Sequence, residues 1–191
     1  ERATSCYRRA LEAFARADDA RGRREALLNL GSCRYLLGDL EEAEEMFEEV
    51  LELARRSGDR RVEALAEGNI GLVQRDRGAM AEAGRRFEAA LETARDAHET
   101  LLEARQLGNL SLVEMYHGEL DGAEEHLTEA VDIFQRHGDA RAVSRALLLL
   151  GEVSMKQGAV RKARWAFGEA RRLADEGGDL GGEARALEKQ A

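Results

Sequence analysis

Apolar residues recur along the chain at intervals of three and four positions, which is the spacing of one face of an α-helix. One stripe of this kind contains Leu40, Ala43, Phe47, Val50, Leu51 and Ala54. A second stripe, just upstream, contains Leu27, Leu30, Cys33 and Leu37. No stretch alternates apolar and polar residues as a half-buried strand does, and proline is absent. The pattern therefore predicts an all-α protein.

The stripes predict helices of about 16–18 residues, each about 25 Å long. Their expected positions are residues 3–17, 20–37, 40–57, 60–77, 80–97, 100–117, 120–137, 140–157, 160–176 and 180–190. Several expected turns pair a glycine with an acid, as in Gly38-Asp39, Gly58-Asp59 and Gly138-Asp139. Glycine can end a helix in the left-handed conformation, and the carboxylate can accept from the first free N–H groups of the next helix.

The pattern repeats every forty residues without a gap. Equivalent positions hold Gly38, Gly78, Gly118 and Gly158, then Ala43, Ala83, Ala123 and Ala163, then Phe47, Phe87, Leu127 and Phe167. We therefore expect four repeats, at residues 20–59, 60–99, 100–139 and 140–179. Residues 1–19 match the second helix of a truncated repeat and 180–191 match the start of a further one, so we expect a fragment of a longer protein. Gly31, Gly71 and Gly151, with Ser111 in the third copy, are expected where two helices nearly touch.

These columns resemble the tetratricopeptide repeat (TPR), in which small and large residues alternate across two antiparallel helices. The unit is forty residues long rather than about thirty-four, and no proline ends it. It is similar to the long-helix, Gly-Asp-linked arrays of cell-polarity adaptors, kinesin light chains and bacterial multidomain regulators. The resemblance implies a right-handed α-α superhelical solenoid whose concave groove is lined by the first helix of each repeat.

Placed in that frame, Asn29, Asn69 and Asn109 form a row along the groove, and Leu149 ends it in the fourth repeat. A side-chain amide has one acceptor and two donors, so it can pair with both backbone groups of an extended peptide. Related long-repeat proteins hold a peptide main chain in this way. The alternative is that each asparagine bonds to a neighbouring helix or was inherited by repeat duplication.

Other first-helix residues would surround a peptide in the groove. The apolar side chains expected to form pockets are Leu72, Leu112, Tyr35, Met115, Tyr116 and Met155. Arg75, Arg105 and Arg145 would favour acidic residues in the ligand, or else are ordinary solvated or ion-paired residues. Leu28 and Asn109 stand where the carboxylate clamp of chaperone-binding TPRs has basic residues, so capture of a C-terminal carboxylate is not expected.

The second helices carry charge of opposite sign at the two ends of the array. Glutamates dominate residues 41–52, whereas arginine and lysine dominate residues 161–172, where Trp165 also lies. This asymmetry could align chains head to tail or steer a partner, or it could serve only solubility.

Composition narrows the function classes. With 29 basic and 38 acidic residues among 191, the net charge is −9, which argues against direct nucleic-acid or anionic-membrane binding. No apolar run is long enough to span a membrane and no signal peptide is visible, and Cys6 and Cys33 are expected as inert packing residues. A cytoplasmic location is therefore expected.

The sequence offers no support for catalysis. The four histidines lack metal-ligand spacing, and no phosphate-binding loop motif is present. We expect no cofactor, no metal and no enzyme activity.

The main hypothesis is a non-catalytic protein-interaction scaffold that binds an extended peptide or a flexible protein segment in the groove. We expect it to serve as the sensor or regulatory arm of a larger bacterial signalling or transcription regulator. The alternative is a structural spacer or self-association segment that acts through the repeat ends and edges.

Overall fold

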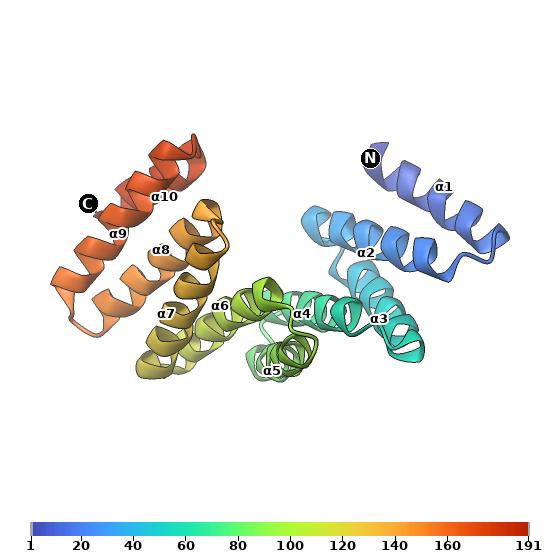
Figure 1. Ribbon diagram of the computed structural model, residues 1–191, viewed down its shortest axis with the longest axis horizontal. Helices are drawn as coiled ribbons and strands as arrows, with labels where there is room; N and C mark the ends of the chain where they lie inside the picture. The colour runs from blue at the N-terminus through green and yellow to red at the C-terminus, as the bar shows by residue number, and fades with distance from the viewer. Residues whose placement is uncertain (1, 191) are drawn as a thin grey trace. The chain divides into compact units, whose positions relative to one another are not determined.

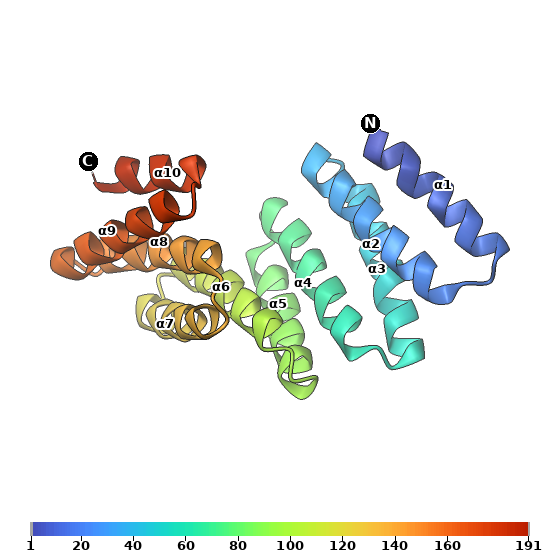
Figure 2. The same cartoon turned by 45° about the horizontal axis from the view of Figure 1, so that its top comes forward.

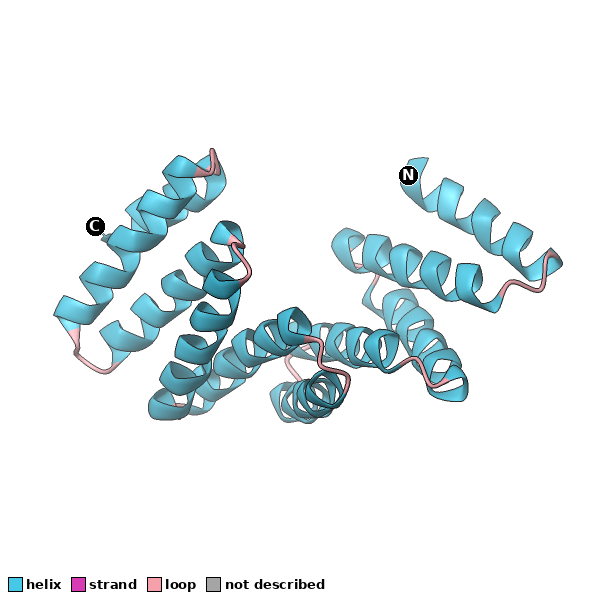
Figure 3. Ribbon diagram, in the orientation of Figure 1, coloured by secondary structure: helices cyan, strands magenta, loops and turns pink. Residues whose placement is uncertain are grey.

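Helices make up nearly all of the chain in the computed structural model, which describes the backbone of residues 2–190 and their side chains except those of residues 2–4, 15, 180, 183 and 190. No strand is present between residues 2 and 190 (Figure 3). The helices are α1 (Arg2–Arg16), α2 (Ala20–Leu37), α3 (Leu40–Ser57), α4 (Arg60–Asp76), α5 (Met80–Asp96), α6 (Thr100–His117), α7 (Leu120–Arg136), α8 (Ala140–Lys156), α9 (Val160–Glu176) and α10 (Leu180–Gln190). The all-α prediction is confirmed, and the expected helix ends are correct to within one residue.

The chain forms two compact units, residues 1–99 and 100–191. Within the first unit, each helix from α1 to α5 packs on the next, and α2 also contacts α4 (Figures 1 and 2). Within the second unit, each helix from α6 to α10 packs on the next, and α8 also contacts α10. Each unit is thus a stack of helix pairs. The division into forty-residue repeats stays a prediction.

Glycine and phenylalanine interlock where paired helices cross. A Cβ on Gly71 would lie 2.7 Å from Cδ1 of Phe87, and one on Gly31 would lie 2.7 Å from Cε1 of Phe47. Gly151 stands in the same relation to Phe167, whose Cδ1 and Cζ would be 2.6 and 2.7 Å from an added Cβ. Real Cβ atoms almost never approach a neighbour this closely, so glycine is required here for packing. The alanines four residues before each phenylalanine position (Ala43, Ala83, Ala123 and Ala163) are all fully buried.

Of the three predicted Gly-Asp turns, all have a left-handed glycine and two have the expected aspartate cap. Gly38, Gly58 and Gly138 have φ of 84°, 69° and 70°. Asp59 accepts a hydrogen bond from the N–H of Val62 at 3.2 Å, and Asp139 accepts from Ala142 at 2.9 Å.

The expected cap is wrong at Asp39, whose side chain makes no capping bond. Its carboxylate instead accepts a hydrogen bond from Arg34 at 2.8 Å. A charge-assisted contact with the guanidinium thus replaces the backbone contact at this turn.

A buried carboxylate ties three helices of the first unit together. The Glu67 side chain on α4 is only 3% exposed and lies 2.5 Å from Arg55 of α3 and 2.9 Å from Arg86 of α5. Glu63, one turn earlier on α4, is 10% exposed and also bonds to Arg55, at 3.1 Å. The two partners provide the charge and the donors that a carboxylate needs when it leaves water.

Candidate functional site

The predicted asparagines differ in what their side chains contact. Asn29 on α2 is exposed and Asn69 on α4 is half-buried. Among the described residues, neither amide has a hydrogen-bond partner, so both remain able to bind a ligand. Asn109 on α6 is half-buried, and its amide donates to Oε1 of Gln106 on the same helix at 3.0 Å. Part of its capacity is therefore used within the protein.

Tyr35 and Arg75, predicted as groove residues of the first unit, bind each other at the ends of α2 and α4. The Tyr35 hydroxyl donates to Asp76 at 2.5 Å and accepts from Arg75 at 3.2 Å. Arg75 also pairs with Asp76 at 2.7 Å. Burial and, after it, the bond to Asp76 raise the pKa of Tyr35. The charge of Arg75 is therefore already balanced by Asp76. Leu72, one turn earlier on α4 and also predicted as a groove residue, is half-buried.

A pocket that the sequence analysis did not foresee lies in the first unit. It has a volume of about 490 Å³ and is lined by Arg21, Arg24, Glu25, Leu28, Asp59, Arg61, Val62 and Leu65, from the amino-terminal halves of α2 and α4 and the turn before α4. Arg21 pairs with Glu25 at 3.1 Å, and Arg24 pairs with Asp59 at 3.0 Å. The pocket wall thus combines these charged pairs with the apolar side chains of Leu28, Val62 and Leu65. In the sequence, Leu28 directly precedes Asn29.

Arg105 and Arg145 lie on α6 and α8 of the second unit, and their side chains are exposed. Within the described part of the chain, neither guanidinium has an ion-pair or hydrogen-bond partner. Desolvation and, after it, the positive charge of Arg145 lower the pKa of Arg105. The positive charge of Arg145 therefore acts on Arg105.

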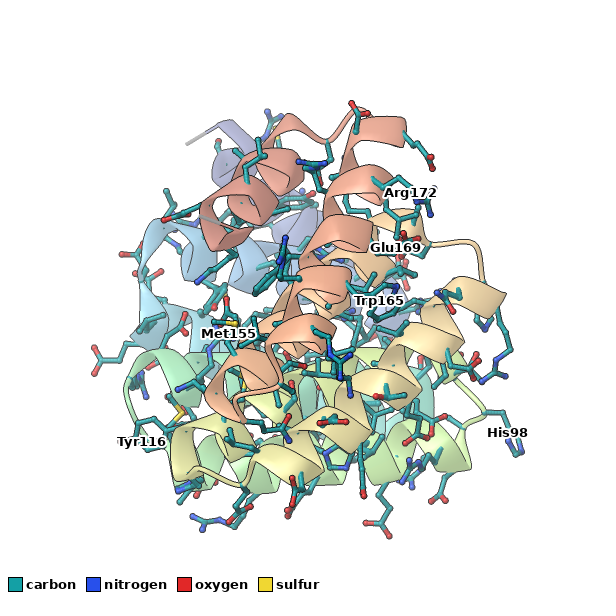
Figure 4. All side chains as sticks on the ribbon, turned by 90° about the vertical axis from the view of Figure 1, so that its left-hand side faces the viewer. His98, Tyr116, Met155, Trp165, Glu169 and Arg172 are labelled. Carbon is teal, nitrogen blue, oxygen red and sulfur yellow. The ribbon has the colours of Figure 1, made fainter. Side chains whose placement is uncertain are left out.

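The other residues predicted to line the groove in the second unit have apolar or aromatic side chains. Leu112 and Met115 on α6 are half-buried, whereas Tyr116 is 66% exposed and Met155 on α8 is 50% exposed. Figure 4 shows Tyr116 and Met155 on one side of the view, away from Trp165, Glu169 and Arg172 of α9. Beside Gly108 of α6, an added Cβ would meet nothing within 4 Å, so a ligand could approach the helix there.

Many charged side chains of the second helices α3 and α9 are balanced by ion pairs. On α3, five glutamates are paired with arginines: Glu42, Glu44, Glu48, Glu49 and Glu52. On α9, Lys162 pairs with Glu124, which lowers the pKa of that carboxyl, and Arg172 pairs with Glu176 at 2.6 Å. These pairs offset much of the predicted asymmetry.

Among the described residues, no group of three or more histidines, cysteines or acids is arranged to hold a metal ion. In that part of the chain, no helix is both long and apolar enough to cross a membrane. Cys33 is partly buried, but the packing role expected for Cys6 is wrong, because its side chain on α1 is exposed.

Comparison with known proteins identifies the repeat. A family model described as the MalT-like TPR region matches residues 1–178. The chain belongs to this TPR family. The resemblance to tetratricopeptide repeats is thereby confirmed, and no curated protein matches the chain in sequence.

Solved TPR-like structures share the fold. BtubC (BKLC) from P. vanneervenii superposes with a TM-score of 0.77 at 19% identity, over 100% of this chain and 89% of BtubC. A Rap protein complexed with competence and sporulation factor gives 0.81 at 20% identity, over 97% of this chain and 57% of the Rap protein. Aspartyl phosphate phosphatase F from Bacillus subtilis gives 0.80 at 14% identity, over 86% of this chain and 43% of the phosphatase. At these identities the likeness shows a common TPR-like solenoid fold.

Proposed function

We propose that the chain is a non-catalytic scaffold whose first helices, α2 and α4 in one unit and α6 and α8 in the other, bind an extended peptide or a flexible protein segment. The observation that carries the proposal is in the first unit. A pocket of about 490 Å³ is lined in part by the apolar side chains of Leu28, Val62 and Leu65. Asn29, whose amide is free among the described residues, follows Leu28 in the sequence of α2. A pocket of this kind can take a ligand side chain while an amide pairs with the ligand main chain.

The fold and one structural neighbour support this proposal. TPR arrays stack helix pairs and so present a long surface made of equivalent positions. A Rap protein of the same fold was solved as a complex with competence and sporulation factor. The phosphatase named among the neighbours is 14% identical to this chain, and at that identity the likeness concerns the fold alone.

We further propose that the chain is the sensor or regulatory arm of a larger regulator in the cytoplasm. It spans 57% of the Rap protein and 43% of the phosphatase with which it aligns. In a regulator of this kind, a peptide held by the repeats would change the contacts of a neighbouring domain. The full-length sequence, with the domain next to the repeats, tests this point.

Peptide binding can be tested with a phage-displayed library of random peptides selected against the purified chain. We expect selected peptides to bind the Asn29→Ala/Asn69→Ala variant several-fold more weakly, since each lost hydrogen bond contributes about 1 kcal/mol. The far-UV circular dichroism melt should barely change, because neither amide is bonded within the described residues. Selected peptides that bind the variant as tightly as the wild type would refute the role of the asparagines.

The alternative, a spacer or self-association segment, predicts a different behaviour. Light scattering would then give a mass that rises with protein concentration, and the library would yield no peptide that binds. Val160 and Trp165 on α9, which are 51% and 59% exposed, are the apolar residues that such an interface could cover.

A further inference from the structure

Two arginines of the second unit are left without the partners that most arginines of this protein have. Arg105 and Arg145 occupy the same repeat position on α6 and α8, and no carboxylate of the described residues pairs with either. Desolvation and, after it, the positive charge of Arg145 lower the pKa of Arg105. Two like charges that act on each other destabilise the folded state, and a bound anion would remove this cost.

Many other arginines in the structure are paired. Arg75 is held by Asp76 at 2.7 Å, Arg86 by Glu67 at 2.9 Å, and Arg136 by Asp132 at 2.7 Å. The chain has nine more acidic than basic residues, so carboxylates are abundant. Arg161 and Arg164 on α9 also lack a partner among the described residues. Arg105 and Arg145 differ from them because they hold equivalent positions on two first helices, α6 and α8.

The neighbouring charges leave the pair free. Arg141, one turn before Arg145 on α8, pairs with Asp179 at 3.6 Å. The same carboxylate also interacts with Arg185, which holds the equivalent repeat position on α10. Asp179 therefore serves Arg141 and Arg185 and leaves Arg105 and Arg145 for a ligand.

The surroundings of Arg105 also leave room for a ligand. Gly108, one turn later on α6, has open space where a Cβ would stand. Leu101, one turn earlier, is 41% exposed. Asn109, at the next position along the same face, keeps its amide oxygen free. A peptide could thus reach the arginines with its backbone close to α6.

We propose that Arg105 and Arg145 form a two-arginine subsite for the carboxylates of an acidic peptide segment. This proposal rests on the proposed peptide-binding function. It adds the class of ligand, an acidic peptide, and the residues that would bind it. The equivalent positions of the first unit hold Glu25 and Leu65, so the same preference is not built there. A guanidinium can bind a carboxylate through two parallel N–H donors, and a bound carboxylate also removes the repulsion between the two arginines.

The probe is a short fluorescein-labelled peptide in which glutamate alternates with serine and leucine. A second peptide carries glutamine in place of each glutamate. We expect fluorescence anisotropy to show tighter binding of the glutamate peptide, and this preference should weaken as salt rises from about 50 to 200 mM. Arg105→Gln/Arg145→Gln should reduce affinity for the glutamate peptide about tenfold or more and leave the glutamine peptide nearly unchanged.

A matched control separates the subsite from general electrostatics. Arg136→Gln on α7 removes one exposed charge from the same unit and is compared with Arg145→Gln. We expect Arg136→Gln to leave binding of the glutamate peptide within about twofold, since exposed pairs contribute little.

Four results would overturn the subsite. Equal affinity of the wild type for both peptides would refute it while leaving the peptide-binding scaffold intact. Equal losses in Arg136→Gln and Arg145→Gln would show that only net charge matters. A labelled single-stranded DNA that binds through the same two arginines more tightly than the peptide would replace the acidic peptide as the ligand class. If neither peptide binds, the subsite is refuted, and the random peptide library decides separately on the scaffold.

Discussion

The interlocked glycines allow a sharp test of the packing, because one substitution should have opposite effects at two sites of the second unit. At Gly151 on α8, an alanine Cβ would lie 2.6 Å from Cδ1 and 2.7 Å from Cζ of Phe167. Phe167 is only 3% exposed, so its ring has little room to move. At Gly108 on α6, the same Cβ would meet nothing within 4 Å.

The magnitudes follow from two opposing effects. Alanine stabilises a helix interior by about 1 kcal/mol relative to glycine. Overpacking of a buried contact costs about 1–3 kcal/mol. We therefore expect Gly108→Ala to stabilise the protein by about 1 kcal/mol. At Gly151 the clash should outweigh the helix term, with a net loss of up to about 2 kcal/mol.

Urea unfolding followed by far-UV circular dichroism measures both variants. The third repeat suggests the compensating change, because Ser111 and Leu127 stand where the fourth has Gly151 and Phe167. Gly151→Ala should therefore be less harmful in a Phe167→Leu background than alone, which a double-mutant cycle detects. If Gly151→Ala stabilised the protein as much as Gly108→Ala, the close contact would not exist and the reasoning would be refuted.

Two further predictions concern turns. His98 has φ of 56° at the position where Gly58, Gly138 and Gly178 stand in the other turns, so His98→Gly should stabilise the protein by about 1 kcal/mol in urea unfolding; unchanged or lower stability would contradict this strain. The N–H of Gly182 and, more weakly, Arg141 lower the pKa of Asp179. This cap therefore stabilises the fold fully above the ordinary aspartate pKa of about 3.9, and the stabilisation is lost as the pH falls through the lower pKa of the folded state. A pH titration of the Gly182 amide by NMR should therefore have its midpoint below about 3.9, and a midpoint above it would show that the cap is absent.

The helices and their packing could be predicted from the sequence because the repeat shows each of them several times. Four copies place a glycine or serine, an alanine and a large apolar residue at fixed distances, and this combination is typical of interlocked helices. The turn prediction failed at Asp39 for a physical reason. Its carboxylate accepts a hydrogen bond from Arg34 of the preceding helix instead of from a backbone N–H. The repeat pattern does not show which of two available donors an aspartate will bind.

The candidate site was only partly predictable. Arg75 and Arg105 look alike in the sequence, and only their surroundings show that Asp76 neutralises Arg75 whereas Arg105 stays free. The pocket of the first unit was missed although it left a trace. Leu65 replaces a charged residue at a column that otherwise holds Glu25, Arg105 and Arg145. An apolar residue in an otherwise charged column can thus point to a pocket.

The position of Trp165 on α9 determines how the protein can be followed by optical methods. It is the sole tryptophan of the chain, and 59% of it is exposed. Indole emission shifts to longer wavelengths in contact with water, so the folded protein should already emit much as an unfolded chain does. Intrinsic fluorescence is therefore a poor monitor of denaturation here. It should instead report contacts that cover the outer surface of α9, where a docked molecule would shift the emission to the blue.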